Sequence, residues 1–402
     1  MIRHHAFFEA LGETEEMTPQ WKSIVAGLAV MRLVDRVADE GEGAKPSEWA
    51  EVTSSRAKVE AVSEGDAARA ILLRSIEEVE SARSLTEQLG ANLLAYGRAL
   101  DLEARWPLAV DVFQTIADRF PFRLHSRIVI EACTALGAAA RNAGQWETSD
   151  RAYARAEHLA ESAGDRALAL TVQVGLANSL AIRGNLPAAE GELAKVFSEA
   201  TSDGLRQIEA LALHARASLA HLRGDYQQTI HLAYRSLELT TNPGARERIL
   251  SDIAAACAGL GMRETARDGY SIVALTSPYQ WVRWQATLNL MELALEEGDE
   301  QVFDDCVKQV ENASLEPRLQ AYFFFFRAMG ARKFGLLNED VLFQEAYDYA
   351  ASHQLNQIAH EIETERKKIP AASRESSELF EPSAELRRVA EALGHLRESV
   401  SS

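Results

Sequence analysis

Lysine is scarce in this chain of 402 residues, which has 42 lysines and arginines together but only eight lysines. The formal net charge at pH 7 is −18. Nucleic acids and anionic membrane surfaces attract clustered positive charge, and no such cluster is found. We therefore expect neither a nucleic-acid partner nor a membrane partner.

Cysteine and long apolar runs are scarce as well. The three cysteines, Cys133, Cys257 and Cys306, are far apart and lie in helical patterns, so disulfides and zinc sites are not predicted. The longest apolar candidate, residues 23–34, is shorter than the roughly 20 residues that a membrane span needs. No export signal is evident at the start. A cytoplasmic location is predicted.

Motifs for catalysis are also lacking, since no phosphate loop, dinucleotide fingerprint, zinc-protease helix or nucleophile elbow occurs. No catalytic residue, cofactor, metal or enzyme activity is predicted. His214 and His221 are seven residues apart on one helix face, and with His231 they raise the alternative of a metal or proton site. Without a third ligand at fixed spacing, a structural or solvent-exposed role is favoured. His4 and His5, at the terminus, receive no role.

A repeated turn signal is what the sequence does contain. The markers ARW, GQW, GNL, GDY, GMR, GDE and GLL begin at residues 104, 144, 184, 224, 261, 298 and 335. Successive markers are 40 residues apart up to residue 224 and 37 apart after it. Apolar residues at three- and four-residue spacing fill the stretches between markers. Each unit therefore reads as two antiparallel helices, A and B, with helix A ending at the marker glycine.

One unit matches a known pattern particularly well. It contains Leu136-Gly137, Gly144, Trp146, Tyr153 and Ala156. In this respect the chain resembles the tetratricopeptide repeat family over roughly residues 88–368, with a period longer than the usual 34 or so. Ser149 stands where that family prefers alanine. The resemblance implies an all-α fold, a right-handed α-α superhelix of stacked helix-turn-helix repeats.

The domain division follows from the same reading. We expect an N-terminal helical cap over residues 1–45, a degenerate first repeat over 46–88 and the repeat array over 89–368. A Pro- and Ser-rich linker is predicted over 369–383, and an amphipathic helix over 384–402. The apolar stripe of that last helix is interpreted as docking on the array. The alternative is docking on a partner chain, including self-association.

The resemblance also implies which residues line the concave groove, because the family uses fixed positions of helix A for this purpose. The groove residues predicted to bind a partner are Arg98, Arg141, Asn178, His214, His221, Arg248, Gln285, Tyr322, Phe325 and Arg332. Asp101, Glu131 and Glu292 are further groove positions. For any single residue, the alternative is that it lies on a solvated inner face of the array and binds no ligand.

Four consecutive phenylalanines, Phe323 to Phe326, follow Tyr322 on a predicted A helix. They cover most of the helix circumference, so we favour core packing over a ligand pocket or a membrane patch. Three of them are expected in the core, with Phe325 partly exposed.

The function predicted is a non-enzymatic scaffold or adaptor that holds a peptide or helix of another protein in the groove. The alternative is a peptide- or small-ligand-sensing regulator similar to bacterial receptors built from tetratricopeptide repeats.

Overall fold

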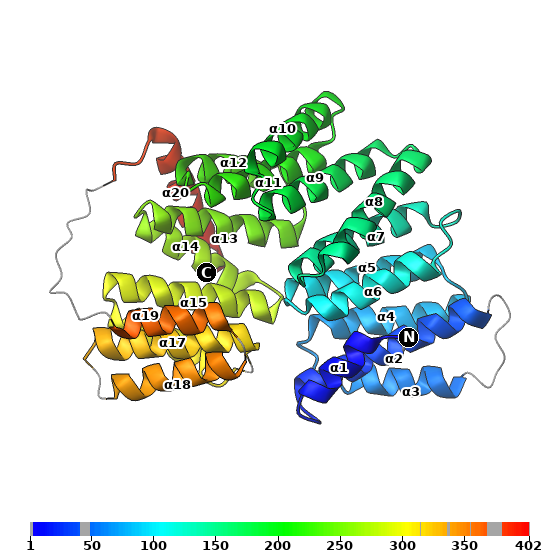
Figure 1. Ribbon diagram of the computed structural model, residues 1–402, viewed down its shortest axis with the longest axis horizontal. Helices are drawn as coiled ribbons and strands as arrows, with labels where there is room; N and C mark the ends of the chain where they lie inside the picture. The colour runs from blue at the N-terminus through cyan, green and yellow to red at the C-terminus, as the bar shows by residue number, and fades with distance from the viewer. Residues whose placement is uncertain are drawn as a thin grey trace. The chain divides into compact units, whose positions relative to one another are not determined.

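The computed structural model describes residues 3–40, 49–313, 315–335, 338–353, 355–367 and 380–401. Within these ranges every element of regular secondary structure is an α-helix, and consecutive helices pack as pairs (Figure 1), so the predicted all-α solenoid class is confirmed. The right-handed sense stays a prediction. The chain divides into two compact units, Met1–Ala212 and Leu213–Ser402, which are described separately.

The first unit contains ten complete helices among the described residues. They are α1 His5–Glu13, α2 Pro19–Glu40, α3 Trp49–Glu60, α4 Ala67–Ala82, α5 Glu87–Leu102, α6 Trp106–Arg119, α7 Ser126–Asn142, α8 Trp146–Ala163, α9 Arg166–Ile182 and α10 Leu186–Ser202. The next helix, α11 Arg206–Leu222, contains the division between the units.

The second unit continues with nine helices in the described ranges. They are α12 Tyr226–Leu239, α13 Pro243–Gly259, α14 Arg263–Thr276, α15 Gln280–Glu297, α16 Glu300–Val310, α17 Pro317–Lys333, α18 Glu339–Ser352, α19 Asn356–Lys367 and α20 Ala384–Ser401. Most of the predicted linker, residues 369–379, lies outside the described residues. The other domain boundaries stay a prediction.

All seven predicted markers lie between helix A and helix B of a pair, as the sequence predicts. Their φ angles are positive, from 55° at Ala104 to 87° at Gly184. This left-handed conformation closes the end of helix A and costs glycine little, which explains why six of the seven markers are glycine. Ala104 holds the same conformation with a Cβ atom, at a cost that glycine avoids.

A glycine inside helix A lets helix B approach closely. A Cβ atom on Gly137 of α7 would lie 2.8 Å from the ring of Tyr153 on α8, so only glycine admits the ring at this position. Ser149 of α8 is fully buried, and its hydroxyl donates to the carbonyl oxygen of Gly137 at 2.7 Å. The buried hydroxyl is therefore paired, which accounts for serine at a position where the resembled family has alanine.

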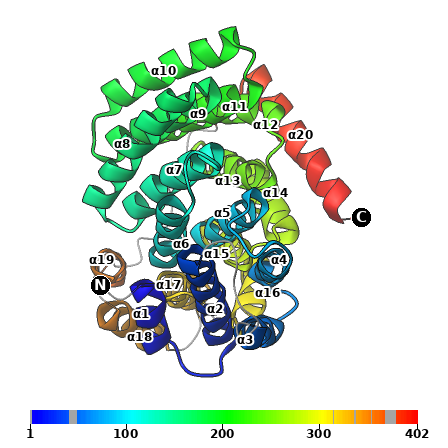
Figure 2. The same cartoon turned by 90° about the vertical axis from the view of Figure 1, so that its right-hand side faces the viewer.

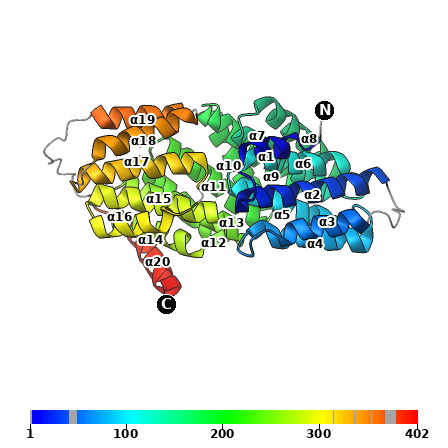
Figure 3. The same cartoon turned by 90° about the horizontal axis from the view of Figure 1, so that it is seen from below.

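Each unit has its own core. In the first unit, buried apolar side chains extend from Phe7 to Val172. In the second, the buried cluster of α15–α19 includes Phe323, Phe325 and Phe326, and Figure 3 shows these helices stacked one on the next. No helix in the described ranges is long and apolar enough to cross a bilayer.

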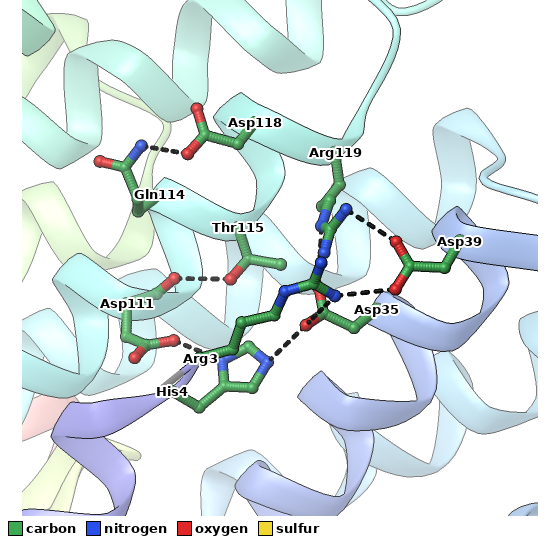
Figure 4. A network of polar contacts seen from close by, with 9 residues as sticks. All are labelled: Arg3, His4, Asp35, Asp39, Asp111, Gln114, Thr115, Asp118 and Arg119. Carbon is green, nitrogen blue, oxygen red and sulfur yellow. Dashed lines mark hydrogen bonds and ion pairs between the residues drawn. The ribbon is translucent and has the colours of Figure 1, made fainter. Parts of the chain in front are cut away.

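The N-terminal helix α1 packs on α2 and α6, and a polar network beside it joins all three helices (Figure 4). The His4 side chain is 3% exposed, with Nδ1 2.6 Å from an Asp111 oxygen and Nε2 3.4 Å from an Asp35 oxygen. Arg119 places Nε 2.9 Å from the same Asp35 carboxylate. The His4 ring therefore lies between a carboxylate of α2 and a carboxylate of α6.

Arg3 completes this network, with NH1 3.2 Å from Asp35 and 2.8 Å from Asp39. The sequence reading gave His4 no role because it lies near a terminus. The structure corrects that reading, because contacts with α2 and α6 bury the ring.

Candidate functional site

The first helices of the pairs contact one another directly, and we call the surface that they form the A-helix face. In the first unit α5 contacts α7, and α7 contacts α9. In the second unit α15 contacts α17, and α17 contacts α19. Because a solenoid stacks its repeats with helix A beside helix A, side chains at equivalent positions of these helices follow each other along one surface.

Charged side chains on the A-helix face of the first unit are paired across neighbouring helices. Arg98 of α5 donates from NH2 to Glu131 of α7 at 2.8 Å, and Arg127 donates from Nε to the same carboxylate at 2.9 Å. The Arg98 side chain is 55% exposed. Surface pairs of this kind contribute little free energy, so a ligand can replace them at small cost.

Arg141, a predicted groove residue on α7, is half-buried and differs from Arg98 in its bonding. Its Nε and NH1 atoms are shielded from solvent and have no hydrogen-bond partner among the described residues. The phenol of Tyr153, on α8, is buried as well. The Arg141 charge acts on this phenol and opposes the rise in its pKa that burial causes. Two guanidinium donors of Arg141 are thus left without acceptors among the described residues.

In the second unit the two predicted histidines are separately engaged. His214 places Nε2 2.8 Å from Asp252 of α13. His221 stacks edge-on against Tyr226, with ring centroids 5.4 Å apart. Its Nδ1 is buried without a partner in the described part of the chain. The histidines therefore do not share one site.

Three further predicted residues stand on A helices with differing exposure. Asn178 of α9 is half-buried, and Arg248 of α13 is exposed. Gln285 of α15 is half-buried and donates to Asn289 at 3.2 Å. None of these three positions is buried beyond the reach of a partner.

The phenylalanine run is core packing, as predicted, but its exposed member was wrongly chosen. Phe325 is only 7% exposed, because its ring packs against Phe343 of α18 at 6.4 Å between centroids. Phe324 is instead the half-buried member and meets Tyr349 edge-on. Tyr322 is half-buried and stacks on Phe326.

Arg332 makes its hydrogen bonds within the chain, so we do not assign it to the proposed binding surface. Its side chain is 17% exposed. NH1 donates to the Glu365 carbonyl oxygen at 2.8 Å and NH2 to that of Arg366 at 3.3 Å. The guanidinium thus caps the last turn of α19, where carbonyl groups lack partners within the helix. Position along helix A could not reveal this use.

An acidic strip crosses α15, α17 and α19 in the second unit. Burial first, and then the carboxylates of Glu296 and Glu361, raise the pKa of Glu292. Glu292 keeps contact with solvent, yet surrounding protein removes part of its hydration. Burial and then the Glu361 charge raise the pKa of Tyr322. A cationic group bound here would relieve the repulsion between the carboxylates.

Glu361 was missed by the sequence reading, although a signal was available. It lies on α19, which contacts the preceding A helix, α17. If the helix predicted over residues 353–368 is treated as a further A helix, Glu361 becomes a candidate for the A-helix face. No group of three or more His, Cys, Asp or Glu side chains arranged to hold a metal ion occurs within the described ranges.

The fold and the site define an all-α protein of stacked helix pairs with a polar A-helix face. No protein-family model matches the sequence, and no curated protein matches it either. Among solved structures, the chain is similar to NprR in complex with its cognate peptide NprX, with a TM-score of 0.48 and 13% sequence identity. The match covers 80% of this chain and 97% of that chain.

Proposed function

We propose that the protein is a non-enzymatic scaffold that binds a peptide or helix of a partner protein along its A-helix face. Several A-helix residues with half-buried or exposed polar side chains support this proposal, Arg98, Arg141, Asn178 and Arg248 among them. An extended surface of this type gains affinity from many contacts and needs no reaction chemistry.

The observation that carries the proposal is the bonding of Arg141. Two of its guanidinium nitrogens are buried and receive no acceptor from the described residues. A buried polar group without a partner costs about 1–3 kcal/mol. A carboxylate or a main-chain carbonyl oxygen of a bound peptide would supply the acceptors, and a guanidinium fits a carboxylate with two parallel hydrogen bonds.

The second unit favours a ligand group of the opposite charge. The strip of Glu292, Tyr322 and Glu361 favours a cationic side chain, because bound positive charge would lower the pKa values that burial and mutual repulsion raise. Each unit therefore offers its own contact to a partner, one for an acceptor group and one for a lysine or arginine.

The test selects ligands with the full chain from a phage-displayed library of linear peptides, and then measures individual peptides by fluorescence anisotropy. We expect Arg141→Gln to weaken binding of the selected peptides by about tenfold or more, equivalent to about 1.4 kcal/mol. Arg151→Gln is the matched control, because Arg151 lies on the B helix α8, outside the A-helix face, with a 72% exposed side chain. The control should change binding by less than about twofold, consistent with the weakness of exposed pairs.

Two results would contradict the proposal. One is a selection that enriches no peptide on the folded full chain. The other is equal binding by the wild-type and Arg141→Gln proteins, provided that circular dichroism shows the same helix content for both. Peptides that require Arg141 should contain a carboxylate, and replacing it with an amide should reproduce the loss.

A further inference from the structure

The C-terminal helix α20 packs chiefly on α12 and α14 of the same unit (Figure 2). Leu386, Val389 and Leu393 are 4%, 2% and 2% exposed, respectively. Their spacing of three and four residues puts them on one face of the helix. Docking on the array was the favoured interpretation of the sequence, and the structure has this arrangement. The apolar stripe is thus covered within the chain.

Ion pairs at both ends of α20 fix its direction on this surface. Near the C-terminal end, Arg397 places NH1 2.6 Å from Asp268 of α14, whose side chain is only 12% exposed. At the N-terminal end, Glu385 pairs with His231 of α12. Asp268 is a largely buried carboxylate, so it selects a helix that carries a cation at the matching position.

The surface on α12 and α14 is therefore one that recognises an amphipathic helix by two features. One feature is the apolar stripe, which follows the pattern Leu386-x2-Val389-x3-Leu393. The other is an arginine four residues later, which faces Asp268. Residues 368–383 separate α20 from α19, and the strongest packing of α20 is on α12 and α14 rather than on its chain neighbours.

We propose that α12 and α14 form a second binding site, for an amphipathic helix of a partner protein that has this pattern, and that α20 occupies the site as an exchangeable internal ligand. The site lies on the B helices of their pairs and does not depend on the function proposed for the A-helix face. Removal of α20 exposes the apolar surface and the Asp268 carboxylate together. A competing helix must then match both features.

The probe is a fluorescein-labelled synthetic peptide of residues 380–402. Its binding is measured by anisotropy on two full-length proteins, the wild type and a variant with Leu386→Asp and Leu393→Asp, whose own α20 no longer docks. We expect the variant to bind the probe about tenfold or more tightly than the wild type, because a tethered helix competes at high effective concentration.

A charge reversal tests the recognition itself. Adding Asp268→Lys to the opened variant should weaken probe binding by about tenfold, and a probe with Arg397→Glu should restore it. Glu264→Lys is the matched control, because Glu264 is exposed on the same helix α14. This control should leave the affinity within about twofold of the opened variant.

Several outcomes would overturn the proposal. These are equal probe binding by the closed and opened proteins, no binding by an opened protein that keeps its helix content, and a charge reversal that the matched probe does not rescue. A wild-type dimer that the probe dissociates, seen by light scattering, would assign the site to α20 of a second copy instead.

Hydrogen exchange on the wild type gives a measurement that needs no variant. If α20 is exchangeable, its amides should exchange about tenfold or more faster than those of α14, because local opening exposes them without unfolding the array. Equal protection of α14 and α20 would show that α20 is a fixed part of the unit, and the proposal would be wrong.

Discussion

Helices α8 and α10 of the first unit are about one turn longer than α12 and α14 of the second, whereas α6 of the first unit has only 14 residues. In the first unit α8 and α10 have 18 and 17 residues, and a left-handed glycine follows each of them, Gly164 and Gly204. In the second unit α12 and α14 have 14 residues each and end at the extended residues Thr240 and Ser277. The A-to-B turns, in contrast, have the same left-handed form in both units.

The longer helix B accounts for the 40-residue intervals that begin at residues 144 and 184. In the interval that begins at residue 104, α6 is short, and the longer connection over residues 120–125 supplies the extra residues. Three residues of helix correspond to about 4.5 Å of length. The longer B helices end in a glycine turn, which continues directly into the next A helix. The shorter ones leave the helix in an extended conformation, and Asn242 then caps α13. A small change of interval in the sequence thus reports the combined length of helix B and of the connection that follows it.

The terminal helices differ as well. In the first unit, α1 is held by a network of buried charges around Asp35 in addition to Phe7. In the second, α20 is held mainly by an apolar stripe, and its Arg397 is 43% exposed. Removing Asp35 breaks contacts with several side chains at once, whereas removing Arg397 breaks one ion pair.

The largest predicted effect comes from the network of the first unit. We expect Asp35→Ala to destabilise this unit by about 3 kcal/mol, the low end for a buried pair, because Arg119 keeps Asp39 and His4 keeps Asp111. Arg397→Ala in the second unit should cost less, about 1–2 kcal/mol, because it removes a single pair from the Asp268 carboxylate. Urea denaturation of both variants gives the comparison. Similar costs for the two would show that the terminal helices are held in the same way.

A smaller effect is predicted for the glycine beneath the long helix α8. Gly137→Ala should destabilise the protein by about 1–3 kcal/mol, because the new methyl group collides with the Tyr153 ring. The control is Gly191→Ala, on the exposed side of α10 with no atom within 4 Å of the added Cβ. That change should be neutral or slightly stabilising, by up to about 1 kcal/mol. Thermal unfolding followed by circular dichroism measures both, and an unaffected Gly137→Ala protein would contradict the packing argument.

The A-to-B turn should respond equally in the two units. Gly184→Ala and Gly261→Ala, at φ angles of 87° and 77°, are each expected to cost about 1 kcal/mol. Ala104→Gly should change stability in the opposite direction, by a smaller amount, because it relieves the strain of a left-handed alanine. The midpoints of urea denaturation curves measure these changes in stability, provided that the variants unfold with the same m value. If the two substitutions lowered the stability by clearly different amounts, the turns of the two units would not be equivalent.

The smallest effect is a pH dependence in the second unit. Burial and neighbouring carboxylates raise the pKa of Glu292 in the folded protein, so its ionised form opposes folding. This penalty is present at neutral pH and disappears as the pH falls through the folded pKa. Glu292→Gln should therefore stabilise the protein at neutral pH and lose that advantage in mild acid. Glu300→Gln, at an exposed position of α16, is the control and should show no such trend.

Much of the fold could be predicted because its signals are local. Each marker needs a left-handed residue, and each helix needs apolar residues at three- and four-residue spacing. The candidate site was harder to predict. Arg98 and Arg141 lie on A helices of the first unit, and their role in binding stays a prediction, but Arg332 caps α19. Phe325 packs against Phe343 although its position in helix A suggested exposure.

By itself, the sequence determined the all-α class, the helix pairs and the places where each helix A ends, because these depend on backbone conformation and helical period. Only the tertiary structure decided that His4 is buried, that Glu361 joins Glu292 and that α20 docks on α12 and α14. Such features depend on contacts between residues far apart in the chain, 107 positions for His4 and Asp111 and 129 for Asp268 and Arg397. No local pattern encodes those pairings.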